Sequence, residues 1–283
     1  MGIYKVFYQC YNKDIKVVKI GGNMTGEQKA ICDKLYEVAK EKLNFLAKEA
    51  GIGEDELKEY FIIKKPETFK EIYEVVLSTL QDYQTMPNTI KFNIEEYKTK
   101  YRELLCDFDI SQVANKTEEQ LFTEFKYFSK RTIEAKSNWG KWLKGALSSA
   151  KFLCKFNTVQ EFLETIEFLD KNNDTREACA LWLQKHIHGM GFALACNFLK
   201  DIGFENFAKP DVHIKDVLVG AKLSDDDELK VYEIVVEMAE IKKTTAFKID
   251  RLIWLVCSGN FFHHNITVKG QKMELIKAVN GEN

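Results

Sequence analysis

The residues best suited to chemistry lie between positions 181 and 218 of a chain of 283 residues. Two apolar stretches with helical spacing are separated there by Gly189-Met190-Gly191. Two glycines around one apolar residue allow a very tight turn and leave backbone N–H groups uncovered at the start of the second helix. Such amides, together with the positive end of the helix dipole, bind phosphate without reading base sequence. A plain turn between two helices remains the alternative for this motif alone.

An acidic group follows the second helix, in Lys209-Pro210-Asp211-Val212-His213. Asp211 stands directly before an apolar stretch at 212–220, and aspartate in that position is typical of a helix N-cap. A carboxylate can also stabilise positive charge that develops on a reacting sugar, or orient an attacking water. Both roles are compatible in one residue, so the sequence leaves them open together.

The two motifs in combination resemble the helix-hairpin-helix DNA glycosylase superfamily (HhH-GPD). Its hairpin has the form L-P-G-h-G-x-[KWS]-x-A, where h is apolar, and an acidic loop of the form hDxH or PDD follows about one helix later. Residues 187–195 match the hairpin, with His188 in place of the usual proline. Residues 210–213 match the loop, in the version most similar to that of 8-oxoguanine DNA glycosylases.

The resemblance implies a role for each matched position. Asp211 would be the catalytic carboxylate that faces an extruded nucleotide. Gly189, Gly191 and the amide of Ala193 would bind the DNA phosphate, and His213 would contact phosphate as well, with a purely structural histidine as its alternative.

The resemblance also implies a structural cation. Backbone carbonyls would hold a monovalent Na⁺ or K⁺ that bridges to phosphate, at Lys185, Ile187 and Met190. No cofactor is expected to be required. The seven cysteines are dispersed and form no CxxC pair, so an iron–sulfur cluster or a zinc ribbon is not expected.

Position 193 departs from the pattern of the bifunctional family members. Those enzymes carry a lysine there, which attacks the sugar, forms a Schiff base and permits strand cleavage. Ala193 cannot do this, so the sequence predicts base removal without lyase activity. Lys200 lies two turns further along the same helix, roughly 10 Å away, and Lys209 is closer to Asp211. Either lysine is an alternative source of an amine.

Positive charge is concentrated in residues 126–155, which hold eight basic residues and a single acid although the whole chain has a net charge of −2. We interpret Lys136, Lys141 and Lys144 as part of a phosphate-facing surface, with an ordinary solvated helix face as the alternative.

Near the end of the helix predicted at 68–84, Gln81 and Gln84 are candidate wedges for the gap left by an extruded base. Ordinary helix-end positions are their alternative. Asp250-Arg251 beside Trp254 indicates a structural ion pair or a pocket wall.

Periodicity and capping patterns predict a mainly α fold, the two-subdomain helical glycosylase fold with a small N-terminal β-hairpin at 3–9 and 15–20. We divide the chain into an N-terminal extension (1–64), a helical glycosylase body (65–262, with the hairpin at 181–203) and a C-terminal tail (263–283). A strand-like piece at 265–272 and a short terminal helix are expected in the tail.

Three functions are compatible with these features. The first is a base-excision-repair DNA glycosylase, monofunctional, which flips a damaged or mismatched base of double-stranded DNA and hydrolyses its N-glycosidic bond. The second is a catalytically inactive DNA-binding module of the same fold, and the third is a helical protein-interaction scaffold.

A monomer is expected. Without a run of 18 apolar residues or a cleavable leader pattern, we expect no membrane partner and an intracellular protein, cytoplasmic and nucleoid-associated if prokaryotic. The base removed is left open.

Overall fold

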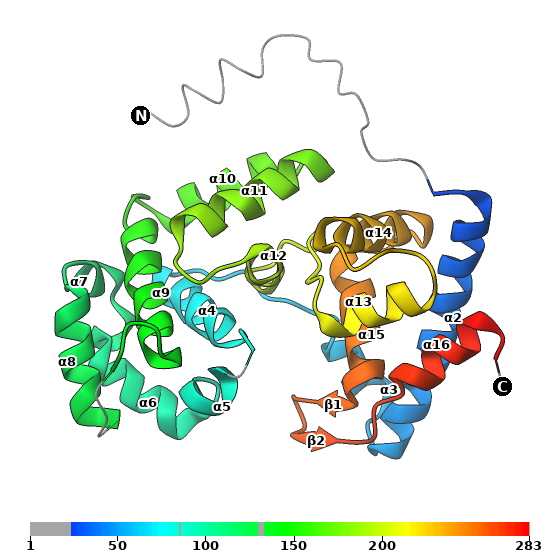
Figure 1. Ribbon diagram of the computed structural model, residues 1–283, viewed down its shortest axis with the longest axis horizontal. Helices are drawn as coiled ribbons and strands as arrows, with labels where there is room; N and C mark the ends of the chain where they lie inside the picture. The colour runs from blue at the N-terminus through cyan, green and yellow to red at the C-terminus, as the bar shows by residue number, and fades with distance from the viewer. Residues whose placement is uncertain (1–23, 85, 130–132, 283) are drawn as a thin grey trace, which may run out of the picture.

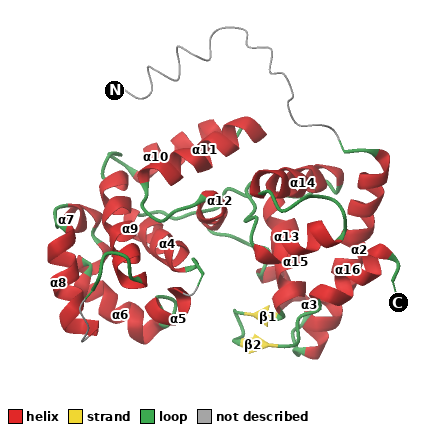
Figure 2. Cartoon of the chain, viewed as in Figure 1, coloured by secondary structure: helices red, strands yellow, loops and turns green. Residues whose placement is uncertain are grey.

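The computed structural model describes residues 24–84, 86–129 and 133–282. The strands predicted at 3–9 and 15–20 lie outside this part, as do Lys130 and Arg131 of the basic segment. Within it the fold is mainly α, as the sequence predicts, and the strands are confined to one two-stranded sheet (Figure 2).

The helices form two lobes on either side of α12 (Phe192–Asp201) (Figure 1). The first lobe holds the elements between residues 69 and 186: α4 (Phe69–Gln81), α5 (Met86–Ile90), α6 (Glu95–Leu104), the 3₁₀ helix η1 (Cys106–Phe108), α7 (Ile110–Ala114), α8 (Glu118–Ser129), α9 (Asn138–Leu153), α10 (Val159–Leu169) and α11 (Asn173–His186). The second lobe combines both ends of the described chain: α2 (Gly26–Glu49), α3 (Glu54–Glu59), α13 (Val212–Gly220), α14 (Glu228–Ile241), α15 (Ala246–Ser258), β1 (Asn260–Phe261), β2 (Ile266–Thr267) and α16 (Lys272–Asn280).

Helix starts follow the capping residues that the sequence offers. Thr25 and Gln28 form a capping box at the start of α2, because each side chain accepts a hydrogen bond from the other's backbone N–H. Thr68 and Glu71 do the same at α4. The predicted strand at 265–272 is shorter in the structure, where Ile266 pairs with Phe261 in an antiparallel hairpin.

Part of the predicted N-terminal extension is integrated into the second lobe. Helix α2 packs against α14, α15 and α16, and its buried face includes Cys32, Leu35 and Leu43. The C-terminal helix α16 packs in turn against α2, α13 and α15. The described residues of 1–64 and 263–283 therefore help to build the lobe that carries α13.

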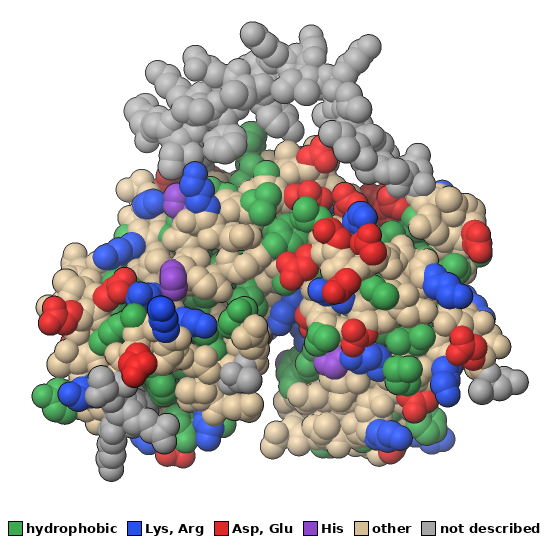
Figure 3. Space-filling view, in the orientation of Figure 1, with side chains coloured by type: hydrophobic (Ala, Val, Ile, Leu, Met, Phe, Trp, Pro, Cys, Tyr) green, Lys and Arg blue, Asp and Glu red, His purple; other side chains and the backbone are tan. Residues whose placement is uncertain are grey.

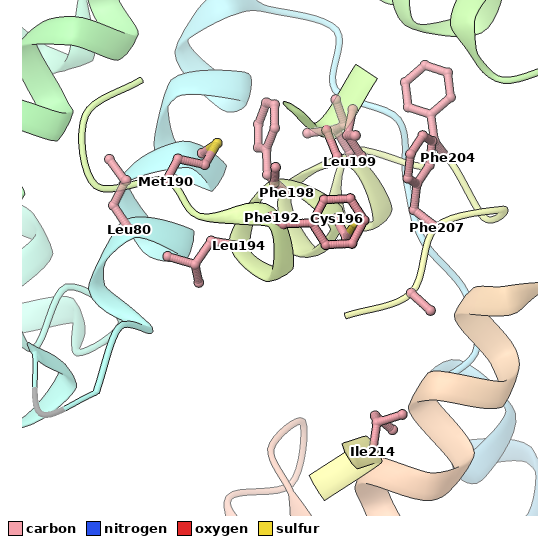
Figure 4. Packing of buried hydrophobic residues seen from close by; sticks show 14 of the residues in the cluster. Leu80, Met190, Phe192, Leu194, Cys196, Phe198, Leu199, Phe204, Phe207 and Ile214 are labelled. Carbon is pink, nitrogen blue, oxygen red and sulfur yellow. The ribbon is translucent and has the colours of Figure 1, made fainter. Parts of the chain in front are cut away.

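A continuous apolar core holds α12 between the lobes. Met190, the apolar residue between the two hairpin glycines, is buried and lies beside Leu80 of α4 (Figure 4). Phe192, Cys196 and Leu199 extend the buried face of α12. The start of α12 is therefore fixed by packing on α4, before any ligand binds. Within the described ranges, no helix combines the length and the apolar composition needed to cross a bilayer.

Candidate DNA-binding and catalytic site

The hairpin turn presents an open backbone surface. Gly189 has φ +80, a conformation that favours glycine, whereas Gly191 has an ordinary extended conformation that any residue adopts. A Cβ at Gly191 would meet nothing within 4 Å, so the fold itself does not require glycine there. Gly191 is the N-cap of α12 and provides no side chain to cap it. The first amides of α12 thus face a space that a phosphate can approach closely.

Helix α9 supports the hairpin directly. The backbone N–H of His188 donates to the Ser148 hydroxyl at 2.8 Å. A Cβ at Gly145 would lie 2.8 Å from the His188 carbonyl, so glycine at 145 allows α9 to approach the turn. Lys141 and Lys144 precede Gly145 within about one helical turn, and the structure therefore brings part of the basic segment next to the hairpin.

The three predicted DNA-binding lysines have different surroundings. Lys136 is exposed in the loop before α9. Lys141 lies over the ring of Tyr83, at 5.9 Å from its centroid, and Lys144 forms an ion pair with Glu118 at 3.6 Å. The pairing of Lys144 is partly exposed and contributes little, so this lysine can exchange Glu118 for another anion.

The three carbonyls suggested as cation ligands differ in the hydrogen bonds that they accept. Ile187 O accepts from Met190 N at 3.2 Å. The carbonyls of Lys185 and Met190 accept no hydrogen bond from the residues that the structure describes. Two unpaired carbonyls beside a third, at the negative end of α11, fit the coordination of a monovalent cation.

Asp211 is the N-cap of α13. Its Oδ1 accepts from the backbone N–H groups of His213 at 2.9 Å and Ile214 at 3.2 Å. Within the described part of the chain, Oδ2 has no hydrogen-bond donor. The capping bonds hold the carboxylate in one orientation, and they leave one oxygen available for another partner.

His213 is half-buried on the first turn of α13. Its Nδ1 is shielded from solvent and has no hydrogen-bond partner in the described residues. Burial lowers the pKa of His213, and the nearby Asp211 carboxylate opposes that effect. The imidazole is therefore mainly neutral at neutral pH.

Asp211 lines a pocket of about 600 Å³ that opens between the two lobes (Figure 3). Its size falls in the range of small-molecule sites. One wall comes from α4 and Asn93, another from α12 and the loop that carries Asp211, and a third from α15 and Phe262. Residues 62–64, in the connection between α3 and α4, also line the pocket.

Two lysines in the pocket are paired with carboxylates. Lys200 Nζ donates to Asp250 Oδ2 at 3.1 Å, and both side chains are almost fully buried. The same carboxylate oxygen accepts from the backbone N–H of Lys209 at 2.6 Å. Lys209 Nζ lies 3.6 Å from Asp82, whose pKa is raised by burial against the opposing effect of Lys209. Asp250 thus ties α12 to the loop that leads into Asp211.

The predicted wedge residues separate in the structure. Gln81 is buried, at 2% exposure, and its Oε1 accepts from the backbone N–H of Phe92 at 2.8 Å. This position does not allow it to enter DNA, so a wedge at Gln81 is wrong. Gln84 is exposed beyond the end of α4, with φ +49, and it stays a candidate wedge.

The third wall of the pocket differs from what the sequence indicates. Asp250 does not form the Asp–Arg pair expected from adjacency, because its carboxylate bonds Lys200. Arg251, Trp254 and Phe262 line the pocket instead. The pattern Arg251 to Trp254, one helical turn apart, was the available sign that both side chains share a face. Nothing in the sequence placed that face opposite Asp211.

Comparison with known proteins agrees with this geometry. Residues 111–240, which include the hairpin and the Asp211 loop, match the family model Ogg-HhH, described as 8-oxoguanine DNA glycosylase. No curated protein and no solved structure matches the chain. The mainly helical fold, the hairpin and the matched residues 111–240 are together consistent with the helix-hairpin-helix DNA glycosylase superfamily.

Proposed function

We propose that this protein is a monofunctional DNA glycosylase, which removes a damaged or mismatched base from double-stranded DNA and leaves an abasic site. The observation that supports this proposal most directly is the position of the Asp211 carboxylate. It is held by two backbone N–H groups at the edge of a pocket between the lobes, with one oxygen free of donors in the described residues. The matched glycosylase domain gives this arrangement its chemical context.

DNA would be held by its backbone. The amides at the start of α12 would bind one phosphate, and Lys136, Lys141 and Lys144 would lie along the adjoining strand. A Na⁺ or K⁺ held by the carbonyls of the turn would supply further positive charge to that phosphate. His213 lies on the first turn of α13, directly after the loop that carries Asp211. Its neutral imidazole would donate a hydrogen bond to a second phosphate.

Base removal would use Asp211 in two ways. As the glycosidic C–N bond breaks, its electron pair leaves with the base and positive charge grows on the sugar, where the fixed carboxylate stabilises it. A water that the carboxylate orients then bonds through its oxygen to C1′ and loses one proton to solvent. The departing base takes a proton from solvent.

The proposed absence of lyase activity follows from the surroundings of the lysines near Asp211. Ala193 has no amine, and the amine of Lys200 is engaged by the buried carboxylate of Asp250. An amine attacks a sugar only when it is neutral. Lys209 also pairs with a carboxylate, that of Asp82. Water is therefore the nucleophile that fits this pocket.

The proposal is tested with duplex oligonucleotides that carry one oxidised, deaminated or alkylated base each. We expect strand scission only after hot alkali, which cleaves abasic sites, and no protein–DNA adduct with borohydride. Scission without alkali, together with an adduct, would refute monofunctional hydrolysis. Salt-sensitive binding to every duplex without base release would identify an inactive DNA-binding module instead.

A further inference from the structure

Arg251 is a cation of the pocket that the proposed mechanism does not use. Lys200 pairs with Asp250 and Lys209 with Asp82, whereas Arg251 forms no ion pair within the described part of the chain. Its Nε is shielded from solvent and has no acceptor there. An unpaired guanidinium in a binding pocket indicates a ligand that carries hydrogen-bond acceptors.

Aromatic rings fix the direction of this guanidinium. Its central carbon lies 4.9 Å from the ring centroid of Phe262 and 5.5 Å from that of Phe247. These contacts hold the charged group against apolar surface and exclude water from part of it. The terminal N–H groups are then the donors left to face the pocket.

The neighbouring wall suits the flat face of a base. Phe262 is 40% exposed although it lines the pocket, and its ring meets Trp254 at 6.0 Å and an angle of 64°. Trp254 follows Arg251 by one turn of α15, so the two side chains share a face. The exposed ring of Phe262 and the partly buried ring of Trp254, beside an unpaired donor, form a surface that can stack on a base and also bind its edge.

We propose that Arg251 is a specificity-determining residue, which donates hydrogen bonds to a carbonyl oxygen of the extruded base while Phe262 and Trp254 contact its face. The consequence is a preference for neutral bases that carry a carbonyl over cationic alkylated adenines, because the guanidinium repels a positive charge. This inference rests on the proposed glycosylase function and narrows its substrate class.

The test replaces Arg251 by Met, which keeps the stem on Phe262 and removes the donors. Arg102 offers a control outside the pocket lining, because its Nε is also buried without a partner and its guanidinium lies 5.9 Å from the ring of Phe108, although its terminal nitrogens pair with Glu74 and Glu95. We expect Arg251→Met to release carbonyl-bearing bases about 10- to 100-fold more slowly, as lost hydrogen bonds to a charged donor predict. Arg102→Met should release them at the wild-type rate.

Two further measurements separate the possible outcomes. Binding of undamaged duplex should be unchanged in Arg251→Met; a uniform loss of affinity with a shallower salt dependence would mean that Arg251 contacts phosphate, and would overturn the proposal. Equal release of a cationic alkylated adenine and a carbonyl-bearing base by the wild type would also overturn it.

Binding without catalysis distinguishes this inference from the proposed function. In the Asp211→Asn background, the preference for duplex with a carbonyl lesion over undamaged duplex should disappear when Arg251 is replaced by Met. If the wild type releases no base at all, the glycosylase function fails, and the loss or retention of this binding preference still decides the role of Arg251.

Discussion

The buried pair of Lys200 and Asp250 allows a quantitative prediction about the anchor of the catalytic loop. Replacing Lys200 by Met leaves the carboxylate of Asp250 buried at 4% side-chain exposure, with only the Lys209 amide as donor. Removing one partner of a buried ion pair costs about 3–5 kcal/mol of unfolding free energy. For a chain of this size the thermal midpoint should fall by about 6–10 °C, at roughly 2 °C per kcal/mol.

The double variant Lys200→Met with Asp250→Asn should recover at least half of that loss. Asparagine keeps an oxygen for the Lys209 amide, and no uncompensated charge remains in the interior. The assay is urea unfolding of the four members of the cycle, followed by fluorescence. Lys242→Met serves as the control, because its pairs with Asp33 and Glu37 lie at the surface, and it should cost at most about 1 kcal/mol.

Two results of the cycle would refute this reasoning. A loss below about 1 kcal/mol for Lys200→Met would mean that water reaches the pair and screens it. A double variant as unstable as the single one would mean that lost packing, and not the uncompensated carboxylate, dominates the effect.

Three other changes have expected outcomes. Ala193→Lys should produce a borohydride-trappable adduct with lesion DNA, because it places an amine on the first turn of α12; gel electrophoresis of the trapped complex checks this. Lys141→Gln should weaken binding of any duplex and lower the salt slope of the affinity by about one, measured by fluorescence anisotropy. Glu177→Gln should raise the melting temperature at pH 8 but not at pH 5. Burial, with Glu233 nearby, raises the pKa of Glu177 to about 7, so stability from its protonated form is lost as pH rises toward and past that value.

Most helices could be predicted because the residues that cap a helix lie within a few positions of its first residue in the sequence. Thr25 with Gln28, Thr68 with Glu71 and Asp211 all cap the helices that the periodicity indicates. The helices α5 and α7 escaped prediction, since five residues are too few to establish a period of 3.6.

The candidate site was predictable only where its residues are close in sequence. Gly189 and Gly191 belong to one short motif and Asp211 to a second one that follows after a single helix, and the turn geometry follows from residue types. The wall made by Arg251 and Phe262 depends on how α15 packs against α13, which no local pattern encodes. Gln81 failed as a wedge for a similar reason: its partner is the amide of Phe92, in a loop whose path the sequence does not reveal.

The central claim is that the capped carboxylate of Asp211 drives glycosidic hydrolysis. The most direct measurement is mass spectrometric detection of free base after incubation of wild-type protein and Asp211→Asn with the same lesion-bearing duplex. We predict free base from the wild type only, at least about 100-fold above the variant, with equal DNA affinity for both, because asparagine preserves the cap. Release of the base by Asp211→Asn at the wild-type rate would contradict the account.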